Sequence, residues 1–145
     1  MPGGPGVSPD MPGGPGVSPE MTACLFCTRL ESPDLLAAND LAGGFLAGFP
    51  VSPGHALIVP RRHEADFFSL TDAEQGAMLA LLPEVRRRIG GEFAPDAYNL
   101  GVNAGKPAGQ TIMHTHLHVI PRYVGDVDEP RGGVRWVLPA TARYW

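Results

Sequence analysis

The chain of 145 residues lacks any long apolar run and any excess of basic residues. No segment approaches the roughly 18 consecutive apolar residues of a membrane span, and the N-terminus lacks the basic-then-apolar pattern of a signal peptide. The formal net charge of -4 gives no positive field that would attract DNA or RNA. We therefore expect a soluble, cytoplasmic protein with neither a membrane nor a nucleic acid as its partner.

Cysteine is also scarce, since Cys24 and Cys27 are the only two in the sequence. Two cysteines make a weak disulfide framework for a secreted protein, but a C-x-x-C pair is common in intracellular metal and redox sites. This spacing supplies two thiolates for zinc, and a closed structural zinc site takes two further ligands. The alternatives are a metal-free pair and a thioredoxin-like redox pair, although no second motif of that fold is found.

Proline and glycine dominate residues 1–20, which consist of one ten-residue sequence occurring twice with a change only at its tenth position. Each copy holds too little apolar surface to offset the entropy of ordering. We expect a disordered leader here and a functional start near Met21. Residues 21–145 then suit a single domain, which at this size can bury about two thirds of its unfolded surface. A C-terminal tail is expected from about residue 123.

Three segments are predicted to be β-strands, and two of them form a hairpin. Residues 43–49 and 54–60 flank a turn rich in proline and glycine, which predicts an antiparallel pair. Residues 97–103 are expected to form a third strand, which pairs with a fourth that follows it. Residues 64–70 are predicted to form a short amphipathic helix.

The main helix is predicted to begin at a capping box, with Thr71 as the N-cap and Glu74 three residues later. Apolar residues then recur at three- and four-residue spacing as far as a stop at Gly90–Gly91. Pro83 lies within this helix and should bend its axis near Leu79, because proline lacks a backbone N–H. The order of elements predicts an α+β fold, in which one long helix covers a face of an antiparallel sheet of about five strands.

The most informative stretch is residues 114–122, in which three histidines alternate with other residues. Because side chains at positions i, i+2 and i+4 of a strand share one face, His114, His116 and His118 are predicted to form one row. Such a row can also be a set of satisfied core residues or an incidental metal site. Neutral imidazole is a competent nucleophile near pH 7, since its unperturbed pKa is about 6.5. The central His116 is therefore the candidate nucleophile.

A glycine-rich loop, residues 101–111, leads directly into this row. Its Gly105-Lys106 pair is not a P-loop, because the required spacing and the Ser or Thr after the lysine are missing. Instead, the backbone N–H groups and the hydroxyl of Gly109, Gln110 and Thr111 are candidate donors to a phosphate, which glycine allows the backbone to approach closely. A plain hairpin loop is the alternative interpretation.

The alternating histidines, the apolar residues after them and the C-x-x-C pair resemble the histidine triad (HIT) superfamily, over about residues 24–122. The resemblance implies the HIT fold and supports the middle histidine, His116, as the nucleophile. We expect attack at the α-phosphorus of a nucleotide and a covalent nucleotidyl-histidine that water releases. His118 is expected to donate to a phosphate oxygen or to the leaving group, while the loop steadies the equatorial oxygens.

Other residues match positions of the family's phosphate site. By this resemblance, His55 lies near the phosphates and supports the triad, and Asn103 and Thr111 contact the phosphate or the leaving group. The chain departs from the pattern at Ala47, where relatives carry an Asp or Asn that binds the ribose hydroxyls. The natural substrate and its base are therefore not predicted.

The resemblance also implies a zinc ion. In the galactose-1-phosphate uridylyltransferase relatives and in some bacterial HIT proteins, the ligands are a C-x-x-C pair, a histidine shortly after the second strand and the first histidine of the triad. The matching residues are Cys24, Cys27, His63 and His114. Such a site would tie the N-terminal segment to the histidine strand and make zinc binding part of folding stability.

The leading hypothesis is a nucleotide hydrolase or nucleotidyl transferase whose substrate is a dinucleoside polyphosphate, a nucleoside phosphoramidate or a sugar nucleotide. A non-catalytic nucleotide sensor or interaction module is the alternative, and a metal-sequestering protein is a third. Arg122, Arg131 and Arg135 are candidates to reach distal phosphates, or else ordinary surface arginines. Because HIT proteins are usually dimers, the resemblance implies a homodimer with Trp136 and the tail at or near the interface.

Overall fold

A computed structural model describes residues 24–145. The leader expected over residues 1–20 and the start expected at Met21 lie outside this range. The described chain forms a five-stranded antiparallel sheet in the order β1-β2-β3-β5-β4. Its strands are β1 (Ala37–Ala38), β2 (Ala42–Leu46), β3 (Ala56–Pro60), β4 (Ala97–Val102) and β5 (Leu117–Arg122). The predicted α+β class and antiparallel sheet are confirmed.

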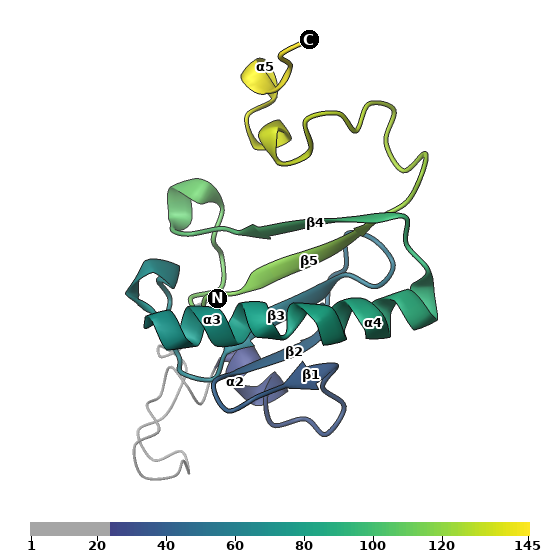
Figure 1. Cartoon of the computed structure of the whole chain (residues 1–145). Coiled ribbons are helices and arrows are strands. Elements are labelled where there is room, and N and C mark those ends of the chain that lie inside the picture. Colours follow the sequence, from purple (N-terminus) through teal and green to yellow (C-terminus); the bar gives the residue numbers. More distant parts are fainter. Residues whose placement is uncertain (1–23) are drawn as a thin grey trace.

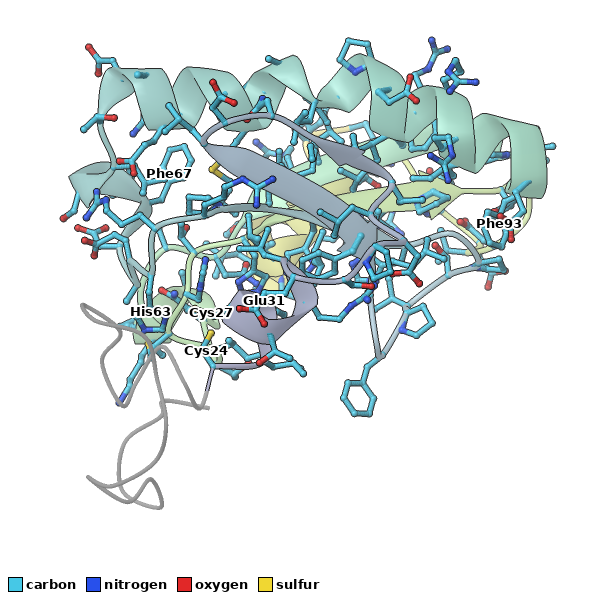
Figure 2. All side chains as sticks on the ribbon, turned by 90° about the horizontal axis from the view of Figure 1, so that it is seen from below. Cys24, Cys27, Glu31, His63, Phe67 and Phe93 are labelled. Atoms are coloured by element: carbon cyan, nitrogen blue, oxygen red, sulfur yellow. The ribbon has the colours of Figure 1, made fainter. Side chains whose placement is uncertain are left out.

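Helices lie on both faces of this sheet (Figure 1). The long pair of α3 (Asp72–Ala80) and α4 (Leu82–Phe93) crosses one face, and the short α2 (Leu25–Arg29) lies against the other, as Figure 2 shows from below. No helix between residues 24 and 145 combines the length and apolar character that a membrane span needs. The helical segments are α2 (Leu25–Arg29), η1 (Phe67–Ser69), α3 (Asp72–Ala80), α4 (Leu82–Phe93), η2 (Lys106–Ala108), η3 (Gly133–Val137) and α5 (Pro139–Ala142).

The central strand β3 is buried on both faces, which explains why its sequence is apolar without alternation. Ala56 and Ile58 join the core under α3 and α4, whereas Leu57 and Val59 join a second core beside α2. The neighbouring strand β5 alternates instead, since only every second residue faces the first core. Its other residues, on the α2 side of the sheet, are His118, Ile120 and Arg122.

The predicted hairpin is confirmed, because β2 pairs antiparallel with β3. β2 ends at Leu46 rather than at residue 49, and the short strand β1 was not predicted. In the connecting loop, Gly54 has a φ of +86°, and a Cβ there would lie 2.9 Å from the ring of Phe93. Only glycine meets both conditions without strain, so the end of α4 packs directly on this loop.

The predicted long helix is confirmed, but it is divided at Leu81 into α3 and α4. Its start is the predicted capping box, in which Thr71 and Glu74 each accept a hydrogen bond from the other's backbone N–H. Pro83 lies in the first turn of α4, where a missing N–H removes no helical hydrogen bond. The helix is therefore interrupted at Leu81, and the bend predicted near Leu79 is not found.

The predicted stop at Gly90–Gly91 is wrong, because α4 continues to Phe93 and ends where Ala94 adopts a left-handed φ of 50°. Each glycine costs a helix roughly 1 kcal/mol relative to alanine. The packing of Phe93 against the loop at Gly54 opposes this cost at the helix end.

The strand predicted over residues 114–122 is shorter than expected, because β5 begins at Leu117. Of the three histidines, only His118 lies on the strand. The segment before it is held outside the sheet, since the N–H of Thr115 donates to the carbonyl of Glu64 at 2.7 Å. The prediction of three imidazoles on one strand face is therefore wrong. The alternating sequence pattern gave no sign that the carbonyl of Glu64 would bond to the N–H of Thr115.

Candidate active site and metal centre

Four candidate metal ligands come together beside α2. One nitrogen or sulfur atom from each of Cys24, Cys27, His63 and His114 lies within 4.8 Å of the others. Cys24 immediately precedes α2 and Cys27 lies within it, so about one helical turn carries both thiols. Figure 2 shows both cysteines near His63 on the α2 side of the molecule. The structure thus brings together all four residues that were predicted to bind zinc.

His114 is oriented for metal binding by a backbone carbonyl. Its Nε2 lies 2.8 Å from the oxygen of Pro60, which can only accept, so Nε2 carries the proton. The lone pair of Nδ1 is then available beside the sulfur atoms of Cys24 and Cys27, at 3.4 and 3.5 Å. A carbonyl partner of this kind commonly fixes the tautomer of a metal-bound histidine.

The distances among these ligands suit a tetrahedral zinc ion. Zinc lies about 2.3 Å from thiolate sulfur and about 2.0 Å from imidazole nitrogen, which puts neighbouring ligands roughly 3.5 Å apart. Three of the four sulfur-to-nitrogen distances in the cluster are 3.4, 3.4 and 3.5 Å. Two thiolates and two imidazoles are also a donor set typical of structural zinc. The residues present therefore fit the predicted metal.

The two thiols are electrostatically unfavourable as a pair of thiolates. Burial, and then the neighbouring sulfur of Cys24, raise the pKa of Cys27 to about 12. A divalent cation supplies the positive charge that would allow both thiols to ionise. This charge requirement adds to the geometric fit.

The loop that presents His63 is fastened to the long helix through its neighbour, Arg62. The Nε and Nη2 groups of Arg62 donate to the two carboxylate oxygens of Glu74, each at 2.9 Å. These hydrogen bonds hold the pKa of Glu74 down, at about 2. Because Glu74 is also the capping-box residue, the start of α3 and the metal cluster share one anchor.

His116 has the opposite ring orientation to His114. Its Nδ1 lies 2.9 Å from the carbonyl oxygen of His114, so Nδ1 carries the proton and donates it. Nε2 is left with its lone pair, as nucleophilic attack requires. The ring is 8% exposed and lies edge-on to Phe26 and His118, with centroids 5.0 and 4.9 Å away.

His118 and His55 form a hydrogen-bonded pair whose direction a backbone N–H sets. The N–H of Val51 donates to Nδ1 of His55 at 3.1 Å, so the proton of neutral His55 is on Nε2. That group donates to Nδ1 of His118, 3.0 Å away. The proton of neutral His118 is therefore on its own Nε2, where it can donate to a ligand.

Electrostatics keep this pair neutral at pH 7. Burial lowers the pKa of His55, and a nearby His116 ring adds to the effect. Burial, followed by the rings of His116 and His55, lowers the pKa of His118 to about 4. The lowered pKa values thus agree with the neutral tautomers of His55 and His118. The site combines the lone pair of His116 with the N–H donor of the neighbouring His118.

The glycine loop is closed by its own hydrogen bonds. The N–H of Gly109 donates to Lys106, and the N–H of Gln110 donates to Gly105. The buried side chain of Gln110 accepts from the N–H of Gly105 and donates to two backbone carbonyls. Gln110 therefore holds the loop in place. The phosphate-binding role of Gly109 and Gln110 stays a prediction. Their backbone N–H groups already donate within the loop, which does not favour this role.

The remaining predicted residues lie at the ends of two loops. Asn103 follows β4, half-buried beside Gly109, and Thr111 is exposed at the other end of the glycine loop. Their contacts with phosphate stay predictions. Ala47, at the expected ribose position, follows β2, and its N–H donates to the carbonyl of His55 at 2.9 Å.

Three contributors to the site have little or no signal in the sequence. The ring of Phe26, between the two cysteines, lies edge-on to His116 and to His114, with centroids 5.0 and 6.0 Å away. It joins the metal cluster to the reactive ring, and its only sequence signal is an apolar position inside C-x-x-C. The carbonyl of Pro60 and the N–H of Val51 are backbone groups. Any residue could supply the carbonyl, and any residue except proline could supply the N–H.

Comparison with known proteins gives a consistent result. A family model described as HIT domain matches residues 31–125. The chain is 31% identical over 108 residues to an uncharacterized HIT-like protein of Saccharolobus solfataricus, covering 72% of this chain and 78% of the relative. It is 36% identical over 104 residues to the adenosine 5'-monophosphoramidase hnt1 of Schizosaccharomyces pombe, covering 69% and 74%. It is 39% identical over 102 residues to the adenylylsulfatase HINT3 of Arabidopsis thaliana, covering 68% and 52%.

Among solved structures, the chain is similar to a Zn-bound histidine triad family protein from Mycobacterium smegmatis. The two are 30% identical and superpose with a TM-score of 0.64, over 73% of this chain and 79% of the other. That protein binds zinc, and the present chain has a fitting Cys2His2 cluster.

Proposed function

Because the chain belongs to the HIT family, we propose that it is a nucleotide hydrolase. It cleaves a bond at the α-phosphorus of a nucleotide and forms a covalent nucleotidyl-histidine on His116. One observation carries the proposal: hydrogen bonds leave a lone pair on Nε2 of His116 and a proton on Nε2 of His118, and the centroids of the two rings are 4.9 Å apart. Nucleotidyl transfer to an acceptor other than water would share the same first step.

In the first step, Nε2 of His116 attacks the α-phosphorus, an N–P bond forms, and the bond to the leaving group breaks. The leaving group takes the electron pair and, when it is an amine, a proton from solvent. His116 keeps its proton on Nδ1, where the carbonyl of His114 stabilises the positive charge of the phosphorylated ring. His118, oriented by His55, donates its Nε2–H to a phosphoryl oxygen or to the leaving atom.

In the second step, water attacks the phosphorus and the N–P bond breaks, so that the electron pair returns to Nε2 of His116. The attacking water releases one proton to solvent, which balances the proton taken up in the first step when the leaving group is an amine. Asn103 and Thr111 are proposed to contact the phosphoryl oxygens, whose charge needs fixed donors during both steps.

We further propose that Cys24, Cys27, His63 and His114 hold a structural zinc ion. Four protein ligands leave no open coordination position, so the ion would supply a tie between chain segments. Through its backbone carbonyl, His114 also orients His116. The zinc cluster therefore supports the position of the reactive ring without touching the substrate.

The named relatives favour an adenosine monophosphate derivative as the first substrate to test. One is named as an adenosine 5'-monophosphoramidase and another as an adenylylsulfatase. Since Ala47 offers no polar side chain at the expected ribose position, the guanosine counterpart belongs in the same test.

The decisive experiment is a quenched single turnover with adenosine 5'-monophosphoramidate, followed by intact-mass measurement. A mass increase of one adenylyl group, absent from His116→Ala, together with steady release of AMP, is the expected result. Bound nucleotide without adduct or turnover would contradict catalysis and support the sensor alternative. More than one zinc per chain, with the excess lost in His116→Ala, would support metal sequestration.

We also propose that the protein is a homodimer. β4 is an edge strand, with no strand on its far side among residues 24–145, and its Leu100 is 45% exposed. The tail beyond β4 adds large exposed apolar side chains, as expected of an interaction surface. They include Val134, Val137, Leu138 and Tyr144. Light scattering should give twice the chain mass, and Leu100→Arg should give a monomer; a wild-type monomer would contradict the proposal.

A further inference from the structure

The side chains next to the reactive histidines can be placed from the pairing of the strands. Phe45 on β2 lies opposite Leu57 on β3, which in turn lies opposite His118 on β5. Because neighbouring strands are about 4.8 Å apart, Phe45 and His118 lie roughly 10 Å from each other on one face of the sheet. This is the face against which α2 packs (Figure 2). Groups around Phe45 are therefore within reach of a nucleotide whose α-phosphorus lies beside the reactive histidines.

Two aromatic rings connect the reactive imidazole with a guanidinium group. The ring of Phe26 lies edge-on to His116, with centroids 5.0 Å apart, and is tilted against Phe45, with centroids 5.7 Å apart. The guanidinium carbon of Arg29 lies over the ring of Phe45, 4.9 Å from its centroid, which is a cation–π arrangement. Phe26 and Arg29 are three residues apart on α2, so they share one side of this helix. Arg29 thus belongs to the surface beside the reactive ring.

The charge of Arg29 is weakly neutralised in the fold. Its Nη1 lies 3.4 Å from one carboxylate oxygen of Asp34, and the hydroxyl of Ser32 donates to the same oxygen. The hydroxyl of Ser32 is also the main cause of the lowered pKa of Asp34, ahead of Arg29. The side chain of Asp34 is 76% exposed, and exposed pairs of this kind contribute little. A phosphate can therefore replace this carboxylate, because it can accept two parallel hydrogen bonds from the guanidinium.

Two other arginines on loops and strands near the histidines are more firmly bound. Nε and Nη2 of Arg122 donate to both carboxylate oxygens of Asp126, at 2.8 and 2.9 Å, and its Nη1 donates to Asn99 at 2.6 Å. This engagement argues against the role of Arg122 in binding distal phosphates. Arg62 donates in the same bidentate way to Glu74. Of these three arginines, Arg29 is therefore the one that can exchange its partner for a ligand.

The residue at the expected ribose position is uncharged. Ala47 packs against the core cluster that contains Phe26 and Phe45, and it offers no acceptor to a ribose hydroxyl. In dinucleotide-binding sites, a carboxylate binds free ribose hydroxyls, whereas an arginine accommodates a phosphate on the ribose. An alanine beside an arginine has the second character. The surface next to His116 thus suits a ribose that carries negative charge.

We propose that Arg29 binds a second phosphate group of the substrate, carried on the 2'- or 3'-oxygen of the ribose. The inference rests on the proposed function and names its substrate class, a ribose-phosphorylated nucleotide that is cleaved at the α-phosphorus. The second phosphate is bound and is not cleaved. Arg29 is accordingly a specificity-determining residue, and α2 carries it together with Cys27 of the zinc cluster.

The test compares adenosine 5'-monophosphoramidate with its 2'-phosphorylated and 3'-phosphorylated derivatives. Wild-type kcat/KM should be about 10-fold higher for one of the two phosphorylated compounds than for the parent, as expected of charge-assisted hydrogen bonds. Arg29→Gln should lower this ratio to about 1, and Arg29→Lys should keep part of it, because lysine retains the charge but not the planar fork. Arg87→Gln, which removes an arginine paired with Glu84 on α4, is the matched control and should keep the ratio.

Arg29→Lys keeps an aliphatic stem against Phe45, so the test remains available if Arg29→Gln does not fold. Equal wild-type kcat/KM for the parent and both phosphorylated compounds would overturn the inference. A ratio that neither variant of Arg29 lowers, or that Arg87→Gln lowers equally, would also overturn it. Failure of the proposed function would look different, because no substrate would then form an adduct on His116. Calorimetry with AMP and with adenosine 2',5'- and 3',5'-bisphosphate would in that case still measure the preference for the second phosphate.

Discussion

His114 and His116 are two residues apart, yet their rings are held in opposite senses. A backbone carbonyl accepts from Nε2 of His114 and turns its Nδ1 toward the cysteines, whereas another accepts from Nδ1 of His116 and leaves its Nε2 free. We call the first region the zinc end (Cys24, Cys27, His63 and His114) and the second the reactive end (His55, His116 and His118). The same side chain thus obtains two chemistries from the position of one carbonyl oxygen.

The two ends are chemically distinct but mechanically joined. The carbonyl that orients His116 belongs to His114, and the ring of Phe26 lies edge-on to both imidazoles. Loss of the reactive imidazole should therefore leave zinc in place, while loss of zinc should disturb both ends. The variants below test this asymmetry.

The largest effect is expected from His116→Ala, which removes the nucleophile. Turnover should fall by a factor of about 10⁴ or more, because the remaining groups cannot form the covalent intermediate. One zinc per chain should remain, since the ligands of the zinc end are untouched. Elemental analysis and AMP release measure the two quantities on one sample, and zinc loss in this variant would contradict the separation of the ends.

Cys24→Ser should give the next largest effect, at the zinc end. Loss of the ion should lower stability by about 3 kcal/mol, or the melting temperature by roughly 10 °C, because metal binding is coupled to folding. Chelation of the wild-type protein should reproduce the shift and added zinc should reverse it, whereas the variant should respond to neither. Stoichiometric zinc in Cys24→Ser would rule out the ligand assignment.

The four candidate metal ligands could be predicted from the sequence only through the resemblance to the HIT superfamily, because the C-x-x-C spacing by itself indicates just Cys24 and Cys27. The resemblance adds His63 and His114, and the structure brings the four residues together. The hairpin and the capping box at Thr71 could be predicted from the residues themselves, since turn residues and N-caps act on their immediate neighbours. Local chemistry explains these two successes.

The division of the histidine row could not be predicted in the same way. Its causes are distant: the N–H of Thr115 bonds to Glu64, and Nε2 of His114 bonds to Pro60, 54 residues earlier. Backbone groups carry no residue-type signal, so tautomers and strand starts that depend on them emerge only with the fold.

His55→Leu should have a moderate effect that is confined to the reactive end. It removes the donor to Nδ1 of His118, so the His118 proton is no longer held on Nε2, and kcat should fall about 10- to 100-fold. His55→Gln can still donate from a similar position and should recover part of the loss. Zinc content should not change in either variant. Equal losses of kcat in the two variants would contradict a tautomer-setting role.

The smallest effect concerns the anchor of the zinc end, where hydrogen bonds from Arg62 hold the pKa of Glu74 at about 2, below its ordinary 4.5. Charged Glu74 therefore stabilises the fold above pH 4.5, and this contribution is lost as the pH falls toward 2. Glu74→Gln should lower the free energy of unfolding by about 1 kcal/mol at pH 7 and by progressively less in acid.

Urea unfolding of the wild type and of Glu74→Gln measures the difference between their free energies of unfolding. Zinc loss in acid affects both proteins, so it largely cancels in this difference. Glu84→Gln, which breaks an exposed pair with Arg87, is the matched control and should show a smaller change. A wild-type advantage over Glu74→Gln that grows in acid would mean that Arg62 does not anchor the zinc end through this carboxylate.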